Sequence, residues 1–172
     1  MEKAMSSLFV IGGARSGKSR YAQARAEATG LRPVFLATAQ AFDEEMRNRI
    51  ARHRVDRGAN WETVEAPLEL AEAITVHSGS DRVLLIDCLT LWANNLILAE
   101  RDMPAAADCL TAAIGRVKGA VVLVSNEVGW GIVPDNALAR RFRDEAGFIN
   151  QRVAAAVDEV QLLVAGLPLR LK

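Results

Sequence analysis

Continuous apolar runs recur along the chain and are separated by longer amphipathic segments. Such runs are typical of strands that are covered on both faces of a parallel sheet. They lie in the strands predicted at residues 8–11, 34–38, 83–86 and 120–124. A last buried strand, which includes Gln161, is predicted at residues 160–165. Two weaker segments extend this set: the alternating residues 61–65 predict an edge strand, and residues 167–171 predict a short hairpin partner.

Apolar residues recur at helical spacing between these runs. The pattern predicts helices over residues 18–29, 43–54, 68–76, 89–101 and 104–118. A last helix is predicted to be capped by Asp135 or Asn136 and to run to about Val157. Strands that alternate with helices predict an α/β fold with a mainly parallel sheet and helices on both faces, formed by a single domain over residues 1–172.

The first apolar run leads into a glycine-rich loop, GGARSGKS at residues 12–19, and then into a predicted helix. A phosphate-binding loop of the pattern G-x-x-x-x-G-K-[ST] requires this order of strand, loop and helix. Glycines let backbone N–H groups turn toward a polyphosphate, and the helix N-terminus adds its positive dipole end. Lys18 is placed to reach the β- and γ-phosphates, and Ser19 to bind Mg²⁺. The alternative is a structural glycine turn.

A carboxylate ends the apolar run at residues 83–86. In P-loop proteins the strand beside the loop often ends in an aspartate that binds Mg²⁺ or its water, and Asp87 fits that position. Any buried strand can end in aspartate, so the P-loop in the same chain is what favours this interpretation. Ser19 and Asp87 are therefore the candidate magnesium ligands.

The predicted helix over residues 43–54 and the residues after it carry a histidine among five arginines. His53 lies near the direction of Met46 and Ile50 on a helical wheel, so it is predicted to face inward. It is either a core histidine bonded to a carbonyl or a group of the nucleotide site. The arginines are either a solvated face or countercharges for a polyphosphate. They are Arg47, Arg49, Arg52, Arg54 and Arg57.

The run at residues 120–124 ends in a long loop with two glycines, Trp130 and Pro134. Its length and its place after a buried strand favour a substrate loop. The alternative is a surface loop whose Trp130 covers the core.

Composition narrows the function classes. The 172 residues carry 21 basic and 21 acidic side chains, so a basic nucleic-acid binder is not expected. No apolar run approaches the length of a membrane span, and residues 1–7 do not resemble a signal peptide. Cys88 and Cys109 are interpreted as buried packing residues of a reduced, cytoplasmic protein. His77 is predicted to be exposed and without a chemical role.

Several motifs together resemble a known family. GGARSGKS, the R-x-x-R-H-R-x-x-R stretch before W-x-T-V-E, LLIDCLTLW-x-N-N-L, VSNEVGWGIVP and FRDEAGFINQRVAAAVDEV span nearly the whole chain. They are similar to the bifunctional adenosylcobinamide kinase/adenosylcobinamide-phosphate guanylyltransferase of cobalamin biosynthesis. The histidine-bearing stretch and the asparagine-glutamate-valine-glycine loop are more specific than the P-loop, which many families share. One departure is Gly58, where many members carry proline.

The resemblance implies a P-loop nucleotide hydrolase-type fold and two reactions. Adenosylcobinamide is phosphorylated by ATP or GTP, and GMP from GTP is then transferred to the phosphate, with pyrophosphate released. Mg²⁺, a homotrimer and covalent guanylylation of His53 are implied, with Lys18 as the other catalytic residue. The implied nucleotide contacts are Gly12, Gly13, Ala14, Arg15, Ser16, Gly17, Lys18, Ser19, Thr38, Ala39, Gln40, Arg54, Val55, Asp56, Arg57, Glu65 and Asp87.

Two other functions remain open at this point. A P-loop small-molecule kinase without the transfer step would leave His53 as a packing or phosphate-contact residue. A nucleotide-sensing module would bind GTP without turnover. The corrinoid is expected at residues 126–134, with help from a neighbouring subunit and with Trp130 against an apolar part of the substrate.

Overall fold

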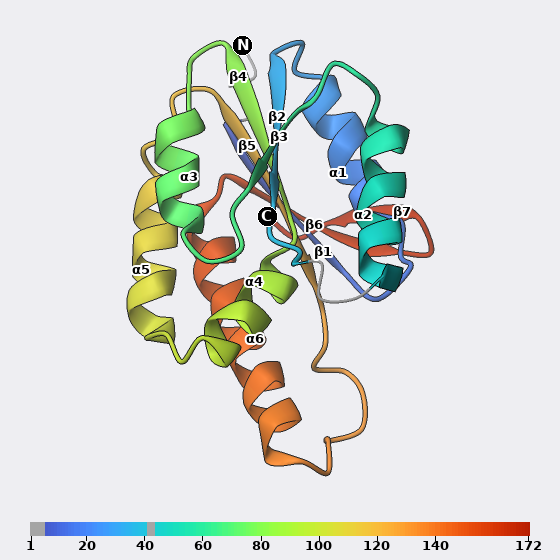
Figure 1. The fold of residues 1–172 in the computed structure, drawn as a ribbon, viewed down its shortest axis with the longest axis vertical. Helices are drawn as coiled ribbons and strands as arrows, with labels where there is room; N and C mark the ends of the chain where they lie inside the picture. Colours follow the sequence, from blue (N-terminus) through green and yellow to red (C-terminus); the bar gives the residue numbers. More distant parts are fainter. Residues whose placement is uncertain (1–5, 41–43) are drawn as a thin grey trace.

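A seven-stranded sheet forms the centre of the computed structural model, in the order β3-β2-β4-β5-β1-β6-β7 (Figure 1). All neighbouring strands are parallel except β6 and β7, which form an antiparallel hairpin. The structure describes residues 6–40 and 44–172; at residues 45, 46, 49, 52–54 and 56 it describes the backbone alone. The strands are β1 (Ser7–Gly12), β2 (Arg32–Ala37), β3 (Glu62–Glu65), β4 (Arg82–Asp87), β5 (Ala120–Asn126), β6 (Glu159–Val164) and β7 (Leu167–Arg170).

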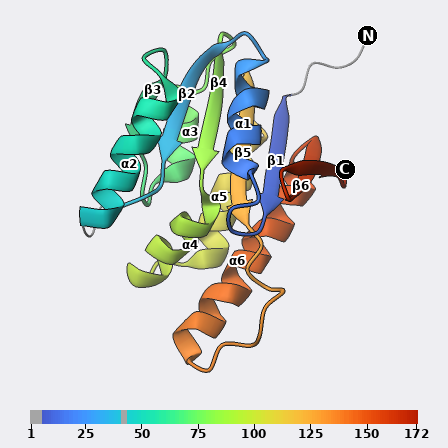
Figure 2. The same ribbon diagram turned by 90° about the vertical axis from the view of Figure 1, so that its right-hand side faces the viewer.

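Helices cover both faces of this sheet. Helices α1 and α2 lie on one face, and α3 to α6 lie on the other (Figures 1 and 2). The predicted α/β fold with a mainly parallel sheet is therefore confirmed. The helices are α1 (Lys18–Glu27), α2 (Glu44–Arg57), α3 (Leu70–His77), α4 (Leu89–Leu98), α5 (Met103–Ile114) and α6 (Ala137–Ala156).

The apolar strands supply two cores, because successive side chains point to opposite faces. Leu8 and Val10 of β1 pack with Ala22 and Ala26 of α1 in the smaller core. Phe9 belongs to the larger core, on the side of α3 to α6. Strands buried on both faces need apolar residues at every position, which explains the continuous runs in the sequence.

Several helices differ from their predicted bounds: α1 ends at Glu27 rather than residue 29, α2 at Arg57 rather than residue 54, and α4 at Leu98 rather than residue 101. For α3 and α5 the hydrogen bonds show the reason. Helix α3 begins at Leu70, because the preceding carbonyls are bonded to α4: the Asn95 side-chain amide donates to the Pro67 carbonyl at 3.0 Å and the Trp92 indole N–H to the Leu68 carbonyl at 2.8 Å. Helix α5 ends at Ile114 rather than near residue 118. There the Lys118 backbone N–H donates to the Ser78 hydroxyl at 2.9 Å, which directs the chain into β5.

One prediction about strand order is wrong. The interpretation of Asp87 places its strand beside the P-loop strand, but β5 lies between β4 and β1. The run at residues 120–124 is apolar at every position, as a central strand requires, and it pairs with both neighbours.

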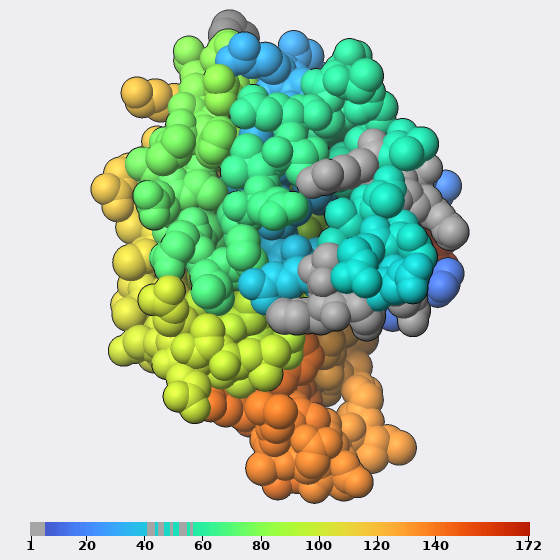
Figure 3. All heavy atoms as spheres, viewed as in Figure 1, coloured from blue at the N-terminus to red at the C-terminus, as the bar shows by residue number. Residues whose placement is uncertain are grey.

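The carboxyl ends of the parallel strands share one edge of the sheet, and the P-loop leaves β1 there. The loop after β5 and the first turns of α6 project beyond the body from this edge (Figure 3, orange). Ligands of such sheets bind outside the carboxyl ends of the strands, so this edge is the candidate site. Among the described residues, no helix is long and apolar enough to cross a membrane.

Candidate active site

The glycine-rich loop closes on itself between β1 and α1. The Ser16 backbone N–H donates to the Gly13 carbonyl at 3.3 Å, and the Lys18 ammonium donates to the same oxygen at 3.2 Å. Arg15 and Gly17 both have a positive φ, 55° and 90°. The closed loop brings the Lys18 ammonium back over its own backbone, at the N-terminus of α1, where a polyphosphate needs a countercharge.

Two glycines of the motif are required by close packing against the C-terminal strands. A Cβ on Gly12 would lie 2.7 Å from the Leu163 carbonyl oxygen and 2.7 Å from the Ser16 hydroxyl. A Cβ on Gly17 would lie 3.2 Å from the Gly166 Cα, at a φ that favours glycine. Gly13 has open space around it, so it leaves the mouth of the loop uncovered.

The Ser16 side chain is a candidate ligand group. Its hydroxyl is buried and has no hydrogen-bond partner within the described part of the chain. A buried hydroxyl without a partner is costly. A phosphate oxygen bound in the loop would accept the missing hydrogen bond, so the donor fits the predicted ligand.

Thr38, one of the predicted nucleotide contacts, forms three hydrogen bonds within the fold. Its buried hydroxyl donates to the Cys88 carbonyl at 2.7 Å and accepts from the Cys88 backbone N–H at 2.9 Å. Its carbonyl accepts from Asn95 at 2.8 Å. Thr38 thus ties the end of β2 to the end of β4, while Ala39 and Gln40 are half-buried beyond it.

The candidate magnesium ligands lie at the same edge. Asp87 is half-buried at the end of β4, and Ser19 is half-buried in the first turn of α1. Helix α1 packs over β4 and β5, and its Ala22 belongs to the same smaller core as Val83 and Leu85. In the part of the chain that the structure describes, no three His, Cys, Asp or Glu side chains form a metal cluster. Mg²⁺ is usually held by one or two protein oxygens, so the donor set fits that ion.

Helix α2 follows β2 and contains His53. The inward direction predicted for the His53 side chain, and the predicted contacts of the Arg54 and Asp56 side chains, lie outside the described residues. Val55 is 79% exposed. The Arg57 guanidinium carbon lies 3.5 Å from the centroid of the Phe35 ring, so the end of α2 packs on β2 from the side of α1.

Polar residues under the end of β5 form a network that the sequence did not reveal. The Thr90 hydroxyl accepts from the Asn126 backbone N–H at 2.7 Å and lies 3.2 Å from the Ser125 hydroxyl. Asn150 of α6 donates to the Asn126 carbonyl at 3.2 Å, and its side-chain oxygen is buried without a partner in the described structure. The signal that could have found Asn150 is a polar residue on the buried face of α6.

The loop after β5 is exposed. Trp130 is 76% exposed, Ile132 98% and Val133 61%. The alternative in which Trp130 covers the core is therefore wrong. At the base of this loop the Glu127 backbone N–H donates to the Gly12 carbonyl at 3.0 Å, so the loop starts in contact with the P-loop.

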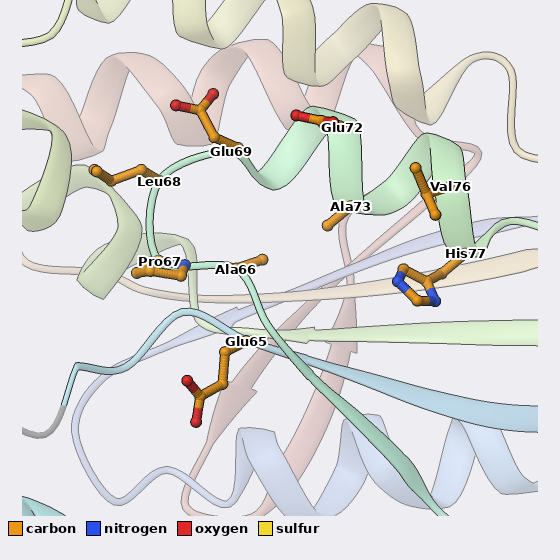
Figure 4. Close-up of a pocket in the computed structure, with 9 residues that line it drawn as sticks. All are labelled: Glu65, Ala66, Pro67, Leu68, Glu69, Glu72, Ala73, Val76 and His77. Atoms are coloured by element: carbon orange, nitrogen blue, oxygen red, sulfur yellow. The ribbon is translucent and has the colours of Figure 1, made fainter.

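A cavity of about 430 Å³ lies between the β3–α3 connection and α3 (Figure 4). Of the predicted site residues whose side chains the structure describes, only Glu65 lines it. In Figure 4 the Glu65 carboxylate points away from Glu69 and Glu72. His77 lines its other end and is half-buried, 3.7 Å from a carboxylate oxygen of Glu62, rather than exposed as predicted. This cavity does not contain the P-loop.

The two cysteines are free and differ in burial. Cys88 is buried as predicted, and burial, with a smaller effect of the Asp87 charge, raises the pKa of its thiol. The prediction was wrong for Cys109, which is exposed on α5. Helix α5 is rich in alanine on both its buried and its exposed side, so the sequence pattern did not show which side Cys109 is on.

Comparisons with known proteins cover nearly the whole chain. The family model described as "Cobinamide kinase / cobinamide phosphate guanyltransferase" matches residues 8–171. Bifunctional adenosylcobalamin biosynthesis protein CobP of Pseudomonas aeruginosa is 46% identical over 166 residues, which cover 95% of this chain and 96% of that protein. The corresponding CobU proteins of Salmonella typhimurium and Escherichia coli are 43% and 41% identical, each alignment covering 96% of this chain and 99% of the relative.

Solved structures support the fold. Flagellar accessory protein FlaH from Methanocaldococcus jannaschii superposes with a TM-score of 0.57 at 12% identity, covering 97% of this chain and 78% of that one. A protein from Pyrococcus horikoshii OT3 gives a TM-score of 0.58 at 9% identity, covering 97% and 86%. At these identities the likeness concerns the fold alone.

Proposed function

Because the chain belongs to the cobinamide kinase/cobinamide phosphate guanyltransferase family, a family of bifunctional enzymes, we propose that it phosphorylates adenosylcobinamide with ATP or GTP. It then transfers GMP from GTP to the phosphate formed, giving adenosylcobinamide-GDP and pyrophosphate. The observation that carries the proposal is the closed loop at residues 12–19, where Lys18 and the buried Ser16 hydroxyl meet the start of α1.

The nucleotide is proposed to lie along the carboxyl edge of the sheet. Its polyphosphate accepts hydrogen bonds from N–H groups of the P-loop and from the Lys18 ammonium. Ser19 and Asp87 are the proposed ligands of Mg²⁺, which supplies countercharge to the phosphates when bound. The remaining proposed contacts are Thr38, Ala39, Gln40, Arg54, Val55, Asp56, Arg57 and Glu65. Within the chain the Thr38 hydroxyl is bonded to Cys88, and the Thr38 carbonyl accepts from Asn95.

The kinase step needs no covalent residue. The aminopropanol hydroxyl of the substrate attacks the γ-phosphorus, the bond between that phosphorus and the β-phosphate oxygen breaks, and the hydroxyl proton leaves to solvent. Positioning and countercharge from the P-loop supply the catalysis.

The transfer step uses His53 as the nucleophile. A neutral imidazole nitrogen attacks the α-phosphorus of GTP, and the bond to the departing pyrophosphate breaks. A phosphate oxygen of the substrate then attacks the same phosphorus, which breaks the N–P bond and restores His53. Lys18 and the arginines of α2 are the proposed countercharges for pyrophosphate.

Labelling with GTP carrying radioactive α-phosphate tests this step. The wild type with Mg²⁺ is expected to retain an acid-labile, alkali-stable label that mass spectrometry places on His53. His53→Ala should lose the label and keep the kinase step. His77→Ala is the matched control, because the chain has only two histidines. Absence of label from the wild type, or label retained by His53→Ala, contradicts the covalent step.

The same proposal includes the assembly. A homotrimer is proposed, with the corrinoid at residues 126–134 of one subunit and help from the next, since exposed apolar side chains project there. Light scattering on the purified chain tests the trimer mass. Residues 1–172 are taken to act as one domain, because all the strands described here join one sheet, and nucleoside triphosphate substrates favour a cytoplasmic location.

A further inference from the structure

The turn of the β6–β7 hairpin contacts the P-loop. The Gly166 backbone N–H donates to the Ser16 carbonyl at 2.8 Å. Ala165 and Gly166 form this turn, with φ values of 51° and 80°. In Figure 1 the red hairpin of β7 lies next to the blue chain that leads into α1. Two segments about 150 residues apart in sequence therefore meet at the phosphate site.

This hydrogen bond fixes the direction of a donor. The C=O and N–H groups of a trans peptide point in opposite directions. The Ser16 carbonyl points out to the hairpin, so the N–H of the same peptide, which belongs to Gly17, points to the other side, into the loop. A phosphate bound there needs that N–H already oriented.

The hairpin is itself fixed to α1. At its base Glu159 accepts two hydrogen bonds from the Arg25 guanidinium, both at 2.9 Å. Leu163, further along β6, holds its carbonyl against Gly12. All four residues of β7 are exposed, so burial of β7 in the core does not explain the position of the hairpin.

We propose that the β6–β7 turn is a positioning element of the phosphate site, and that the Gly166 N–H sets the direction of the Gly17 N–H toward the polyphosphate. Gly166 is a positioning residue that acts through Ser16 and Gly17. The inference rests on the proposed nucleotide site and adds to it residues beyond the P-loop.

Gly30 provides a matched control for Gly166. It also has a left-handed φ, 69°, it also has open space for a Cβ, and its N–H also donates a backbone bond, to the Glu27 carbonyl at 3.1 Å. It lies between α1 and β2, at the opposite edge of the sheet. Proline at either position removes the N–H and forces a negative φ.

The test compares GTP affinity, by calorimetry, and Tm in Gly166→Pro and Gly30→Pro. Both variants should lower Tm. Gly166→Pro should weaken GTP binding about tenfold or more, and Gly30→Pro by less than about twofold. Gly166→Asn, which keeps the N–H and tolerates a left-handed φ, should retain the affinity. Equal affinity losses in the two proline variants, or none in Gly166→Pro, overturn the proposal.

A variant that fails to fold and a failure of the proposed reaction can both be told apart from a failure of this proposal. If Gly166→Pro does not fold, the pair Gly166→Ala and Gly30→Ala decides, with about a threefold weaker GTP affinity expected only for the first. A wild type that binds GTP but makes no product from adenosylcobinamide contradicts the proposed reaction and leaves the comparison valid. A wild type that does not bind GTP contradicts both.

Discussion

The P-loop and the loop after β5 leave the same edge of the sheet but are held very differently. The P-loop is bonded from outside at two carbonyls, Gly12 by Glu127 and Ser16 by Gly166. In the loop after β5, the side chains of Trp130 and Ile132 are largely exposed to solvent. One loop is built before any ligand arrives, and the other presents apolar surface.

This difference follows from the chemistry expected of each loop. A polyphosphate is bound by N–H groups that must already point at it, because orienting them on binding would cost affinity. A large, partly apolar substrate or a second subunit gains from burying exposed side chains. The comparison therefore predicts that P-loop changes affect nucleotide steps, and that changes in the second loop affect corrinoid binding.

The largest effect is expected for Lys18→Met. Loss of the ammonium removes a countercharge from both phosphoryl steps, so kcat/KM for the kinase and the transfer reaction should each fall by about 10²- to 10³-fold or more. Steady-state assays of both products measure this. Lys118→Met, in the exposed connection before β5, is the control and should be unaffected. If Lys18→Met retains either activity, the P-loop does not serve that reaction.

A second prediction separates packing from binding within the P-loop. Gly12→Ala places a Cβ 2.7 Å from the backbone oxygen of Leu163, so the free energy of unfolding should fall by about 2 kcal/mol. Gly13→Ala meets open space and should change it by less than about 0.5 kcal/mol. Urea unfolding of both variants measures the difference. Equal stabilities would show that β6 does not hold the loop as described.

The fold and the site differ in how far the sequence could predict them. The strand runs and the P-loop were predictable, since burial on both faces and phosphate binding each leave a local pattern. The place of β5 between β4 and β1 depends on pairing between distant segments. Thr38 is a nucleotide contact implied by the resemblance, whereas the bonds of its hydroxyl to Cys88 could not be predicted, because they depend on which strand lies next to β2. Gly166 carries no signal, because its partner Ser16 is remote in sequence.

A third prediction addresses the exposed loop. Trp130→Ala should weaken binding of adenosylcobinamide about tenfold and leave GTP affinity unchanged. Because Trp130 is 76% exposed, Tm should change by less than about 2 °C. Leu98→Ala, an exposed apolar residue at the end of α4, is the control. A change of oligomeric mass with unchanged corrinoid affinity would assign Trp130 to a subunit contact instead.

The smallest effect is expected at the base of the hairpin, in the pair Arg25–Glu159. Hydrogen bonds from Arg25, and then from Gln161, lower the pKa of the Glu159 carboxyl in the folded chain, against the opposing effect of burial. A lowered folded pKa means that the stabilisation is present above the unfolded pKa of about 4.3 and is lost as the pH falls through the folded value.

Glu159→Gln should therefore lower the free energy of unfolding by about 1 kcal/mol at pH 7. The effect is modest because the side chains of Arg25 and Glu159 are 28% and 15% exposed, so that solvent partly screens their interaction. The deficit relative to the wild type should shrink as the pH is lowered below about 4. Urea unfolding at pH 7 and near pH 3.5, with Arg25→Gln and the double variant completing a cycle, isolates the pair. If the variant's loss of unfolding free energy is the same at both pH values, Glu159 acts through packing, and its negative charge does not help to hold the hairpin on α1.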